Sequence, residues 1–408
     1  MKIKDFFSVS DNKNNNATIM WLCWMHFCWG VAASMIFSLL PIFIVDELGG
    51  DSKSFGLLEG SVIFLAFTSK LLAGFIIDAF KKKLPMLKAG TLFTIVSKLL
   101  FACASNMFFV FIAKAIDRFF EGLRRAPSDA ILAELASKKG FAYSFRHMMN
   151  ISGYFLGSII TSQIVYIYSK NFRVIFTLAI IPTVVALYIL TTKIKYDKDS
   201  KSREVRAKHK WKIKDITLMP KGYWHLIITI SLLFFNRFSE GFITLRAKEI
   251  LPDSIGSFPL FMSIYEIFAI SVAIPFGKLS DKFDKRKTLL LGIAILFIAD
   301  IFGIIANNVF TIVAIYIFAG IHYGATHGIL GALVAQTAPK HLIGTALAFY
   351  YGIDGIVLFF SNNLAGRSSG IARFIGLEGS SGPFIVGALV SLLAMLYLYC
   401  WLKKEKFK

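Results

Sequence analysis

The sequence predicts an all-α membrane protein in which twelve transmembrane helices form two pseudo-symmetric six-helix bundles. Three observations support this prediction: an apolar composition, twelve apolar segments of membrane-spanning length, and a sequence repeat on either side of a basic central loop. Of the 408 residues, 56% are hydrophobic and 17% are charged, and the mean hydropathy is +0.64. A soluble domain contains about 25% charged residues, so this composition excludes a soluble protein.

Each of the twelve apolar segments is close to the length of about 20 residues that a helix needs to cross a bilayer. The segments lie at 17–45, 55–80, 86–105, 107–126, 142–169, 172–192, 222–245, 258–277, 288–306, 309–335, 343–365 and 383–402. With the N-terminus in the cytoplasm, 33 of the 45 Lys and Arg residues fall on the cytoplasmic side. The positive-inside rule supports this orientation, in which both termini are cytoplasmic.

A basic segment divides the spans six and six. We expect an N-terminal bundle at 1–192, a basic cytoplasmic linker at 193–221 and a C-terminal bundle at 222–408. The formal net charge of +20 does not indicate a nucleic-acid partner, because the basic residues occupy short loops between apolar spans. We expect the chain to lie in the lipid bilayer as a monomer.

The four cysteines lie in apolar segments and lack the CxxC or Cys/His spacing of a metal site. We expect Cys23, Cys28, Cys103 and Cys400 to be buried packing residues, and we expect no metal and no cofactor. The sequence also lacks a G-x-x-x-x-G-K-(S/T) phosphate-binding loop. Any energy that the protein uses should therefore come from an ion gradient or a solute gradient.

The fourth span carries charged residues that share one face of the predicted helix. They are Lys114, Asp117, Arg118, Glu121 and Arg125. An ionised group near the centre of a bilayer costs about 3 kcal/mol or more, so it is retained where it faces a partner or a water-filled interior. We predict that this face lines a solute path. The alternative is an intrahelical ladder of ion pairs that only fixes packing.

Other intramembrane polar residues extend the candidate site. Arg237, Glu240 and Thr244 form one stripe along the seventh span, at positions i, i+3 and i+7. Lys70 lies deep in the second span, and His322 lies at mid-depth in the tenth, where a packing role is the alternative. Together these residues supply more cations than a sugar site needs, which favours an anionic or zwitterionic solute.

Isolated carboxyl groups are candidates for proton coupling. Asp354 lies midway along the eleventh span, and Glu266 is similarly isolated in the eighth. Asn150 is the fifth-span counterpart of Asp354 and is a candidate solute contact. Lys98 and Asp300, in the third and ninth spans, are instead predicted to make structural pairings. A desolvated carboxyl group readily takes up a proton, whereas a salt bridge would keep it ionised.

A loop motif occurs once in each half. Both copies place a Gly, an Asp and a basic cluster between two spans on the cytoplasmic side. The residues are Gly74, Asp78, Lys82 and Lys83, then Gly277, Asp281, Lys282, Lys285 and Arg286. We expect the Gly to permit close helix packing, the Asp to cap or pair, and the basic residues to hold the turn and a cytoplasmic gate.

These motifs resemble the major facilitator superfamily, whose loop signature is G-x-x-x-D-(R/K)-x-G-(R/K)-(R/K). The fourth span also matches the R-x-x-x-G pattern with Arg118 and Gly122, and its run from Asp117 to Ala130 resembles one bacterial branch of that family. The resemblance implies the superfamily fold, a transport role and a location in the bacterial inner membrane. It places the third and ninth helices outside the ring that surrounds the cavity.

We therefore expect a secondary active transporter of a small anionic or zwitterionic solute that works by alternating access and is coupled to protons. A drug or siderophore exporter or importer of the same fold is the nearest alternative. A membrane-embedded enzyme or a non-transporting sensor is the alternative from another class. We do not expect an enzyme, because no H-E-x-x-H motif is present.

Overall fold

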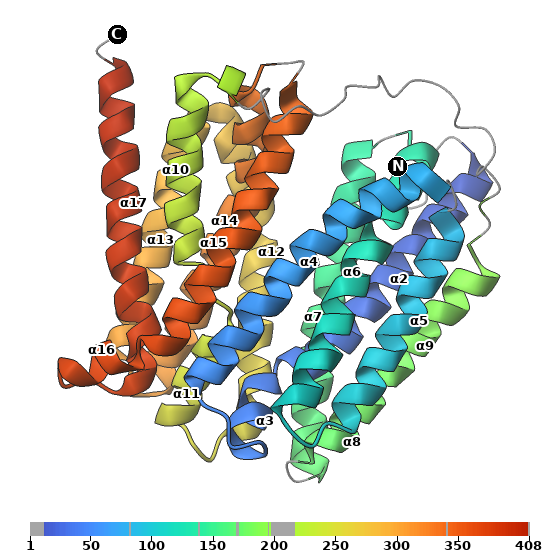
Figure 1. Ribbon diagram of the computed structural model, residues 1–408, viewed down its shortest axis with the longest axis horizontal. Helices are drawn as coiled ribbons and strands as arrows, with labels where there is room; N and C mark the ends of the chain where they lie inside the picture. The colour runs from blue at the N-terminus through green and yellow to red at the C-terminus, as the bar shows by residue number, and fades with distance from the viewer. Residues whose placement is uncertain are drawn as a thin grey trace. The chain divides into compact units, whose positions relative to one another are not determined.

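The computed structural model describes residues 12–80, 83–137, 139–168, 171–194, 196, 217–339 and 342–406. Within these ranges the regular structure is helical, which confirms the predicted all-α fold class (Figure 1). The chain divides into two compact units. Unit 1 comprises Met1–Phe43 and Leu65–Arg206, and unit 2 comprises Ile44–Phe64 and Ala207–Lys408.

Three helices of the N-terminal half begin at asparagine side chains that cap their first turns. Asn12 precedes the first helix, Asn106 accepts a hydrogen bond from the backbone N–H of Phe109, and Asn171 precedes α8. These helices are α2 (Lys13–Phe37), α3 (Leu40–Asp46), α4 (Ser52–Phe80), α5 (Lys83–Ala102), α6 (Met107–Leu135), α7 (Lys139–Tyr168), α8 (Phe172–Leu178) and α9 (Ile180–Thr192).

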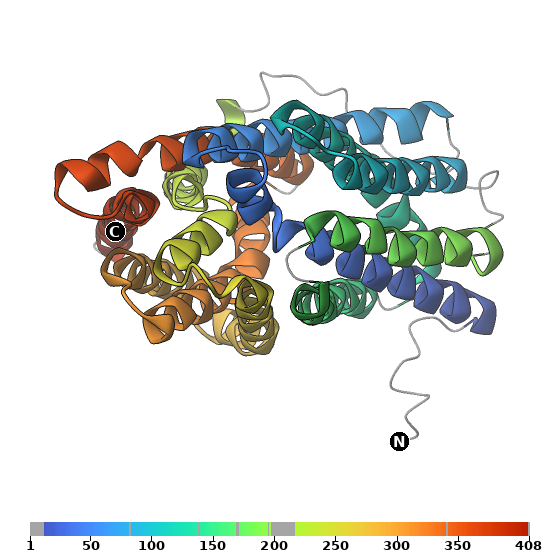
Figure 2. The same ribbon diagram turned by 90° about the horizontal axis from the view of Figure 1, so that it is seen from below.

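In the C-terminal half, Asn308 caps α14 through a capping box with Thr311. Its helices are α10 (Lys221–Phe235), α11 (Gly241–Ile250), α12 (Phe258–Lys282), α13 (Lys285–Ile305), α14 (Val309–Thr337), α15 (Ile343–Arg367), α16 (Ser369–Phe374) and α17 (Gly382–Lys406). Short 3-10 turns lie at Ile255–Ser257 and Gly379–Ser381. The short helix α16 connects α15 to α17 (Figure 2).

Eight helical segments in the described part of the chain are long and apolar enough to cross a membrane. They are Asn14–Asp46, Lys83–Ala102, Ala142–Tyr168, Phe172–Thr192, Ile255–Ser280, Lys285–Ile305, Val309–Thr337 and Gly379–Lys403. The remaining predicted spans are helical as well, in α4, α6, α10 with α11, and α15. Of these, α6 carries the charged face predicted above, and α10 is only 15 residues long.

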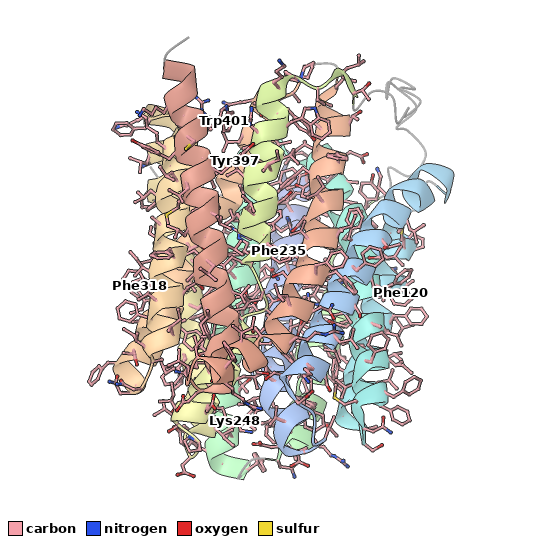
Figure 3. All side chains as sticks on the ribbon, turned by 60° about the vertical axis from the view of Figure 1, so that its left-hand side comes forward. Phe120, Phe235, Lys248, Phe318, Tyr397 and Trp401 are labelled. Carbon is pink, nitrogen blue, oxygen red and sulfur yellow. The ribbon has the colours of Figure 1, made fainter. Side chains whose placement is uncertain are left out.

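Two predicted spans are interrupted rather than continuous. The first span breaks between α2 and α3, at residues 38–39. The seventh breaks between α10 and α11, so residues 236–240 leave the helix and the predicted i, i+3, i+7 stripe is wrong as a continuous helical stripe. In Figure 3, Phe235 at the end of α10 lies between Lys248 and Trp401, which mark opposite ends of unit 2. The second break therefore lies partway between the two ends of unit 2.

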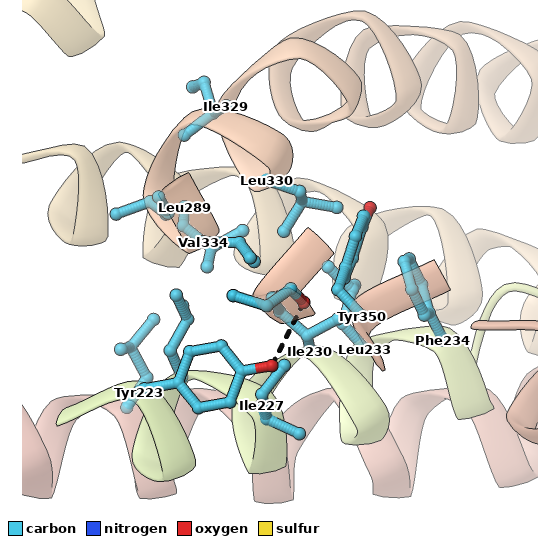
Figure 4. Close-up of a cluster of buried hydrophobic side chains, with 14 of the residues drawn as sticks. Tyr223, Ile227, Ile230, Leu233, Phe234, Leu289, Ile329, Leu330, Val334 and Tyr350 are labelled. Atoms are coloured by element: carbon cyan, nitrogen blue, oxygen red, sulfur yellow. Dashed lines mark hydrogen bonds between the residues drawn. The ribbon is translucent and has the colours of Figure 1, made fainter. Parts of the chain in front are cut away.

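Each unit has its own apolar core. In unit 1 the core residues come mainly from α2, α6 and α9, and include Leu22, Ile131 and Leu190. In unit 2 they come mainly from α10, α13, α14 and α17. Figure 4 shows members of this core from α10, α13, α14 and α15. The phenol of Tyr223 is buried in that second core, where it donates a 3.1 Å hydrogen bond to the carbonyl of Ala346. The bond satisfies a polar group that would otherwise be buried without a partner.

The segment Ile44–Phe64 packs within unit 2, although it follows the first span in sequence. Gly56 of α4 faces α15, where an added Cβ would clash with the carbonyl oxygen of Asn362 and lie 2.9 Å from the Cα of Gly366. Lys248 forms an ion pair with Asp46 in the same region. Small residues at both sides of this contact allow the two helix backbones to approach closely.

The prediction that all four cysteines are buried is correct for Cys23 and Cys28 and wrong for Cys103 and Cys400. Cys103 directly follows α5, and Cys400 lies near the end of α17. Both are in apolar runs, and the outer face of a membrane helix is itself apolar. Hydrophobicity of the surrounding sequence therefore does not distinguish a lipid-facing cysteine from a core cysteine.

Candidate functional site

The break in the seventh span is held open by side chains from other helices of unit 2. The backbone N–H of Ser239 donates a 2.8 Å hydrogen bond to Oδ1 of Asn362. Ser361 donates a 2.8 Å hydrogen bond to the carbonyl of Phe235, the last residue of α10. Non-helical backbone at membrane depth is tolerated where protein groups or a water-filled cavity satisfy its hydrogen bonds. Discontinuous helices of this kind form solute sites in secondary transporters.

Arg237 lies in this break and contacts α14. Its Nε donates a 3.1 Å hydrogen bond to Nε2 of His322, and its terminal nitrogen bonds the hydroxyl of Thr326. Because Nε2 of His322 accepts this bond, the ring proton sits on Nδ1, which donates a 2.8 Å bond to the carbonyl of Gly292. His322 is therefore a neutral support for the Arg237 guanidinium. No carboxylate forms an ion pair with Arg237 in the described part of the chain.

The other members of the predicted seventh-span stripe face different partners. Glu240 accepts a 3.2 Å hydrogen bond from the phenol of Tyr265, on α12. Thr244 lies 3.1 Å, oxygen to oxygen, from the phenol of Tyr316. The helical break thus places Arg237 against α14 and Glu240 against α12.

Glu266 of α12 is one of the most secluded carboxyl groups of unit 2. Only 6% of the residue is exposed, and its Oε2 atom has no hydrogen-bond partner among the described residues. Burying an ionised carboxylate without a partner is costly, whereas a protonated carboxyl group can be buried at a lower cost. Glu266 therefore has the surroundings of a carboxyl group that binds a proton.

Two cations on the polar face of α6 in unit 1 lie close to the ring of Phe37, the last residue of α2. The ammonium of Lys114 lies 5.2 Å from the ring centroid and the guanidinium of Arg118 lies 4.5 Å from it. Such distances allow cation–π attraction. Arg118 also donates a 2.7 Å hydrogen bond to Glu121, which pairs with Arg125 at 3.4 Å. The alternative of an intrahelical ladder thus describes part of this face, since Glu121 bridges two arginines.

Asp117 makes a structural pairing instead of facing the others. It binds the ammonium of Lys98 at 2.9 Å and the hydroxyl of Ser97 at 3.1 Å, both from α5. The predicted structural pairing of Lys98 is therefore present. The predicted role of Asp117 in binding solute remains a prediction.

Asn150 of α7 joins the first helix through its amide. Its Nδ2 donates a 2.9 Å hydrogen bond to the carbonyl of His26, whose Nε2 lies 2.8 Å from the hydroxyl of Ser128. The three residues link α7, α2 and α6 within unit 1. If Asn150 contacts a solute, its side-chain oxygen is the atom that would accept a hydrogen bond from it.

Several predicted residues lie where little can be described. Lys82 lies outside the described residues, as do the side chains of Lys70, Gly74, Asp78 and Asp281. Asp354 of α15 is only half-buried.

The remaining residues of the loop motif differ in their burial and in their contacts. Lys83 pairs with Glu134 and donates a 3.0 Å hydrogen bond to Tyr196. Gly277 shows no close packing, because an added Cβ would meet no described atom within 4 Å. Lys282 is exposed, while Lys285 and Arg286 are half-buried at the start of α13.

Asp284, which occupies the Gly position of the motif, caps α13 by accepting a 2.9 Å hydrogen bond from the N–H of Arg286. Hydrogen bonds from the Arg286 side chain hold the pKa of Asp284 below its ordinary value. The second copy of the motif therefore has a helix cap where the family signature has a turn glycine.

The structure adds residues that sequence reasoning missed. Phe37 and Tyr265 contact candidate residues but are uncharged, and Asn362 binds the helical break from a position far away in sequence. Asn236 is the exception, because a polar amide beside Arg237 within an apolar run is itself a signal of a broken helix. The described residues contain no group of three His, Cys, Asp or Glu side chains suited to a metal.

The sequence model of the Major Facilitator Superfamily matches residues 22–247 and 247–408 of the chain. The chain belongs to the Major Facilitator Superfamily. An uncharacterized MFS-type transporter of Methanocaldococcus jannaschii is 24% identical over 377 residues, which cover 90% of each chain. YqjV, an uncharacterized MFS-type transporter of Bacillus subtilis, is 22% identical over 379 residues, covering 90% of this chain and 88% of YqjV.

Solved structures of this superfamily share the fold. A variant of the nucleoside transporter NupG aligns with a TM-score of 0.80 at 11% identity, covering 94% of this chain and 99% of NupG. A bacterial homolog of the human lysosomal transporter Spinster aligns with a TM-score of 0.73 at 12% identity, covering 96% of both chains. At these identities the similarity establishes the fold alone. This superfamily member is therefore a multi-pass membrane protein with a transporter fold.

Proposed function

We propose that this superfamily member is a secondary active transporter that moves a small anionic or zwitterionic solute across the bacterial inner membrane by alternating access. The orientation proposed from the distribution of Lys and Arg has both termini in the cytoplasm. Membership of the superfamily supports the transport role. The names of fold relatives, which include nucleoside and proton-dependent oligopeptide transporters, fit a small hydrophilic solute.

The observation that carries the solute class is the guanidinium of Arg237 in a broken helix. Its described hydrogen-bond partners, His322 and Thr326, are neutral, so its positive charge is not cancelled by an adjacent carboxylate in the described structure. A guanidinium presents two parallel donors that match a carboxylate or phosphate. Lys114 and Arg118 around Phe37 give unit 1 a second group of cations. We propose that each of these two groups, within its own unit, can bind the anionic part of a solute.

We further propose that proton uptake drives the transport, with Asp354 as the coupling carboxyl group and Glu266 as the second candidate. The seclusion of Glu266 supports its place in this proposal. A carboxyl group that is protonated in one conformation and ionised in another converts a conformational change into proton binding. Neither role requires a cofactor.

The proposed function is tested with purified protein in two stages. A thermal-shift screen against nucleosides, peptides, carboxylates and carboxylate chelators identifies a ligand class, because a ligand that binds the native state raises its apparent stability. Uptake of the best radiolabelled ligand is then measured in proteoliposomes with and without a pH gradient. Uptake above empty liposomes, increased by the gradient, is expected. Binding without flux would instead identify a sensor, and chemical conversion of the ligand would identify an enzyme.

A further inference from the structure

The carboxyl group of Asp300 on α13 is buried in unit 2 without a cationic partner. Only 2% of the residue is exposed. Its Oδ2 accepts a 2.7 Å hydrogen bond from Nδ2 of Asn236, and Ser391 of α17 lies 3.5 Å away. None of the described Lys, Arg or His side chains forms an ion pair with it. An isolated carboxylate in such surroundings is costly to keep ionised.

Asn236 is the first residue after α10, so this pairing is part of the break in the seventh span. Its amide nitrogen is fully used, because it also donates a 2.6 Å hydrogen bond to Ser391. Its Oδ1 is buried and has no hydrogen-bond partner in the described structure. A buried amide oxygen without a donor is unusual and requires an explanation.

The unpaired Oδ1 of Asn236 and the Oδ1 of Asp300 meet at Gly387 of α17. A Cβ added to Gly387 would clash with Oδ1 of Asn236 and would lie 2.8 Å from Oδ1 of Asp300. The absence of a side chain at Gly387 therefore leaves room for both acceptor oxygens beside it. Two acceptors that face each other repel unless a proton or a cation lies between them.

We propose that Asp300, Asn236 and Ser391 form a proton-binding site in which Oδ1 of Asp300 carries the proton and donates a hydrogen bond to Oδ1 of Asn236. This arrangement satisfies the unpaired oxygen and removes the buried charge in one step. A sodium ion fits less well. The side chains described at the site supply few oxygens, and the Asn236 amide directs its N–H groups at Oδ2 of Asp300 and at Ser391.

The charged groups on the elements that pack around Asp300 are engaged elsewhere. Arg246 of α11 binds the carbonyls of Gly303 and Ala306, at the end of α13, and pairs with Glu378. His322 of α14 is bonded to Gly292 and Arg237. Asp300 is therefore the group that we expect to gain or lose a proton at this site.

Release of the proton has a direct structural consequence. An ionised Asp300 would repel Oδ1 of Asn236, so the amide would have to move. Because Arg237 is the next residue, this movement would reposition the guanidinium that we propose to bind solute. This last consequence rests on the proposed function, whereas proton binding by Asp300 does not.

The test is infrared spectroscopy of the purified full-length protein in nanodiscs, with and without ¹³C-labelled aspartate. The probe is the carbonyl stretch of a protonated carboxyl group, which differs from that of a carboxylate. At neutral pH the wild type should show a protonated aspartate band that shifts on labelling. The band should lose intensity in Asp300→Asn, which retains the shape of the protonated group, and be unchanged in the control Asp253→Asn, at an exposed position between α11 and α12. Ser391→Ala should keep the band but change its frequency.

Three outcomes would overturn the proposal: a wild type without a protonated aspartate at neutral pH, a band of unchanged intensity in Asp300→Asn, or a band that disappears when sodium replaces potassium in the buffer. The labelled wild type and Ser391→Ala keep the test decisive if Asp300→Asn does not fold. None of these measurements needs a solute, so this inference can be tested separately from transport. A protein that has a protonated Asp300 but no flux would contradict the proposed function and leave this inference intact. A protein that transports solute while Asp300 is ionised would contradict this inference and leave the proposed function intact.

Discussion

The ammonium of Lys98 lies 2.9 Å from a carboxylate oxygen of Asp117, and 1% and 4% of the two side chains are exposed. The pair joins α5 to α6 inside unit 1. A buried ion pair has a large desolvation cost, and its stability depends on both partners being present. The pair therefore affects the stability of the protein, because either side chain without the other would be a buried charge that lacks its ion-pair partner.

We expect Lys98→Met to destabilise the protein by about 3–5 kcal/mol, because it leaves the carboxylate of Asp117 buried without its ammonium partner. Adding Asp117→Asn should recover part of this loss. The measurement is a double-mutant cycle from denaturant unfolding in detergent. If the loss in the double variant equals the sum of the two single losses, the residues are not coupled.

The second prediction concerns the proposed recognition of anions. Arg118→Lys and Arg237→Lys keep the charge but lose the planar pair of donors. Loss of one charged hydrogen bond costs about 1.5–3 kcal/mol, so solute affinity should fall by roughly ten- to a hundredfold. Affinity is measured by ligand-dependent thermal shift or by isothermal titration with the solute found in the screen.

The control for this prediction is Arg173→Lys, at an exposed position in α8. It should bind the solute with wild-type affinity. Wild-type affinity in both Arg118→Lys and Arg237→Lys would exclude the two arginines as the recognition groups. A loss in the Arg173 variant of similar size would indicate an effect on stability instead.

The third prediction tests the close packing of α4 against α15. Gly56→Ala should destabilise the protein by about 1–3 kcal/mol, because its Cβ would overlap the backbone oxygen of Asn362. Gly328→Ala is the matched control, since an added Cβ there meets no described atom within 4 Å. Thermal unfolding in detergent should therefore separate the two variants. Equal melting temperatures would contradict this packing.

The sequence predicted the helical spans well because the signals for a span are local. Apolar length and flanking basic residues are read within about 20 residues, without knowledge of tertiary contacts. The charged face of α6 was predictable for the same reason, since helical periodicity alone places Lys114 and Arg118 on one side. Their shared contact with Phe37, by contrast, depends on how α2 and α6 pack.

The break in the seventh span was not predicted, because the groups that hold it are distant in sequence. Asn236 is bonded to Asp300, 64 residues later, and Ser239 is bonded to Asn362, 123 residues later. A local pattern of apolar residues with period 3.6 continues through the break. In the sequence, Asp300 is likewise a single carboxyl group in an apolar span. Its contacts with Asn236, Gly387 and Ser391 are seen only in the structure.

The final prediction concerns the proposed coupling to protons. Asp354→Asn cannot release a proton, so it should abolish accumulation driven by a pH gradient while leaving exchange of solute down its own gradient largely intact. Glu266→Gln is the parallel variant, at the more secluded carboxyl group. Both are measured in proteoliposomes with an imposed pH gradient, alongside counterflow without a gradient. Loss of accumulation in only one variant assigns coupling to that residue, whereas accumulation that persists in both would exclude both carboxyl groups and favour another ion or another site.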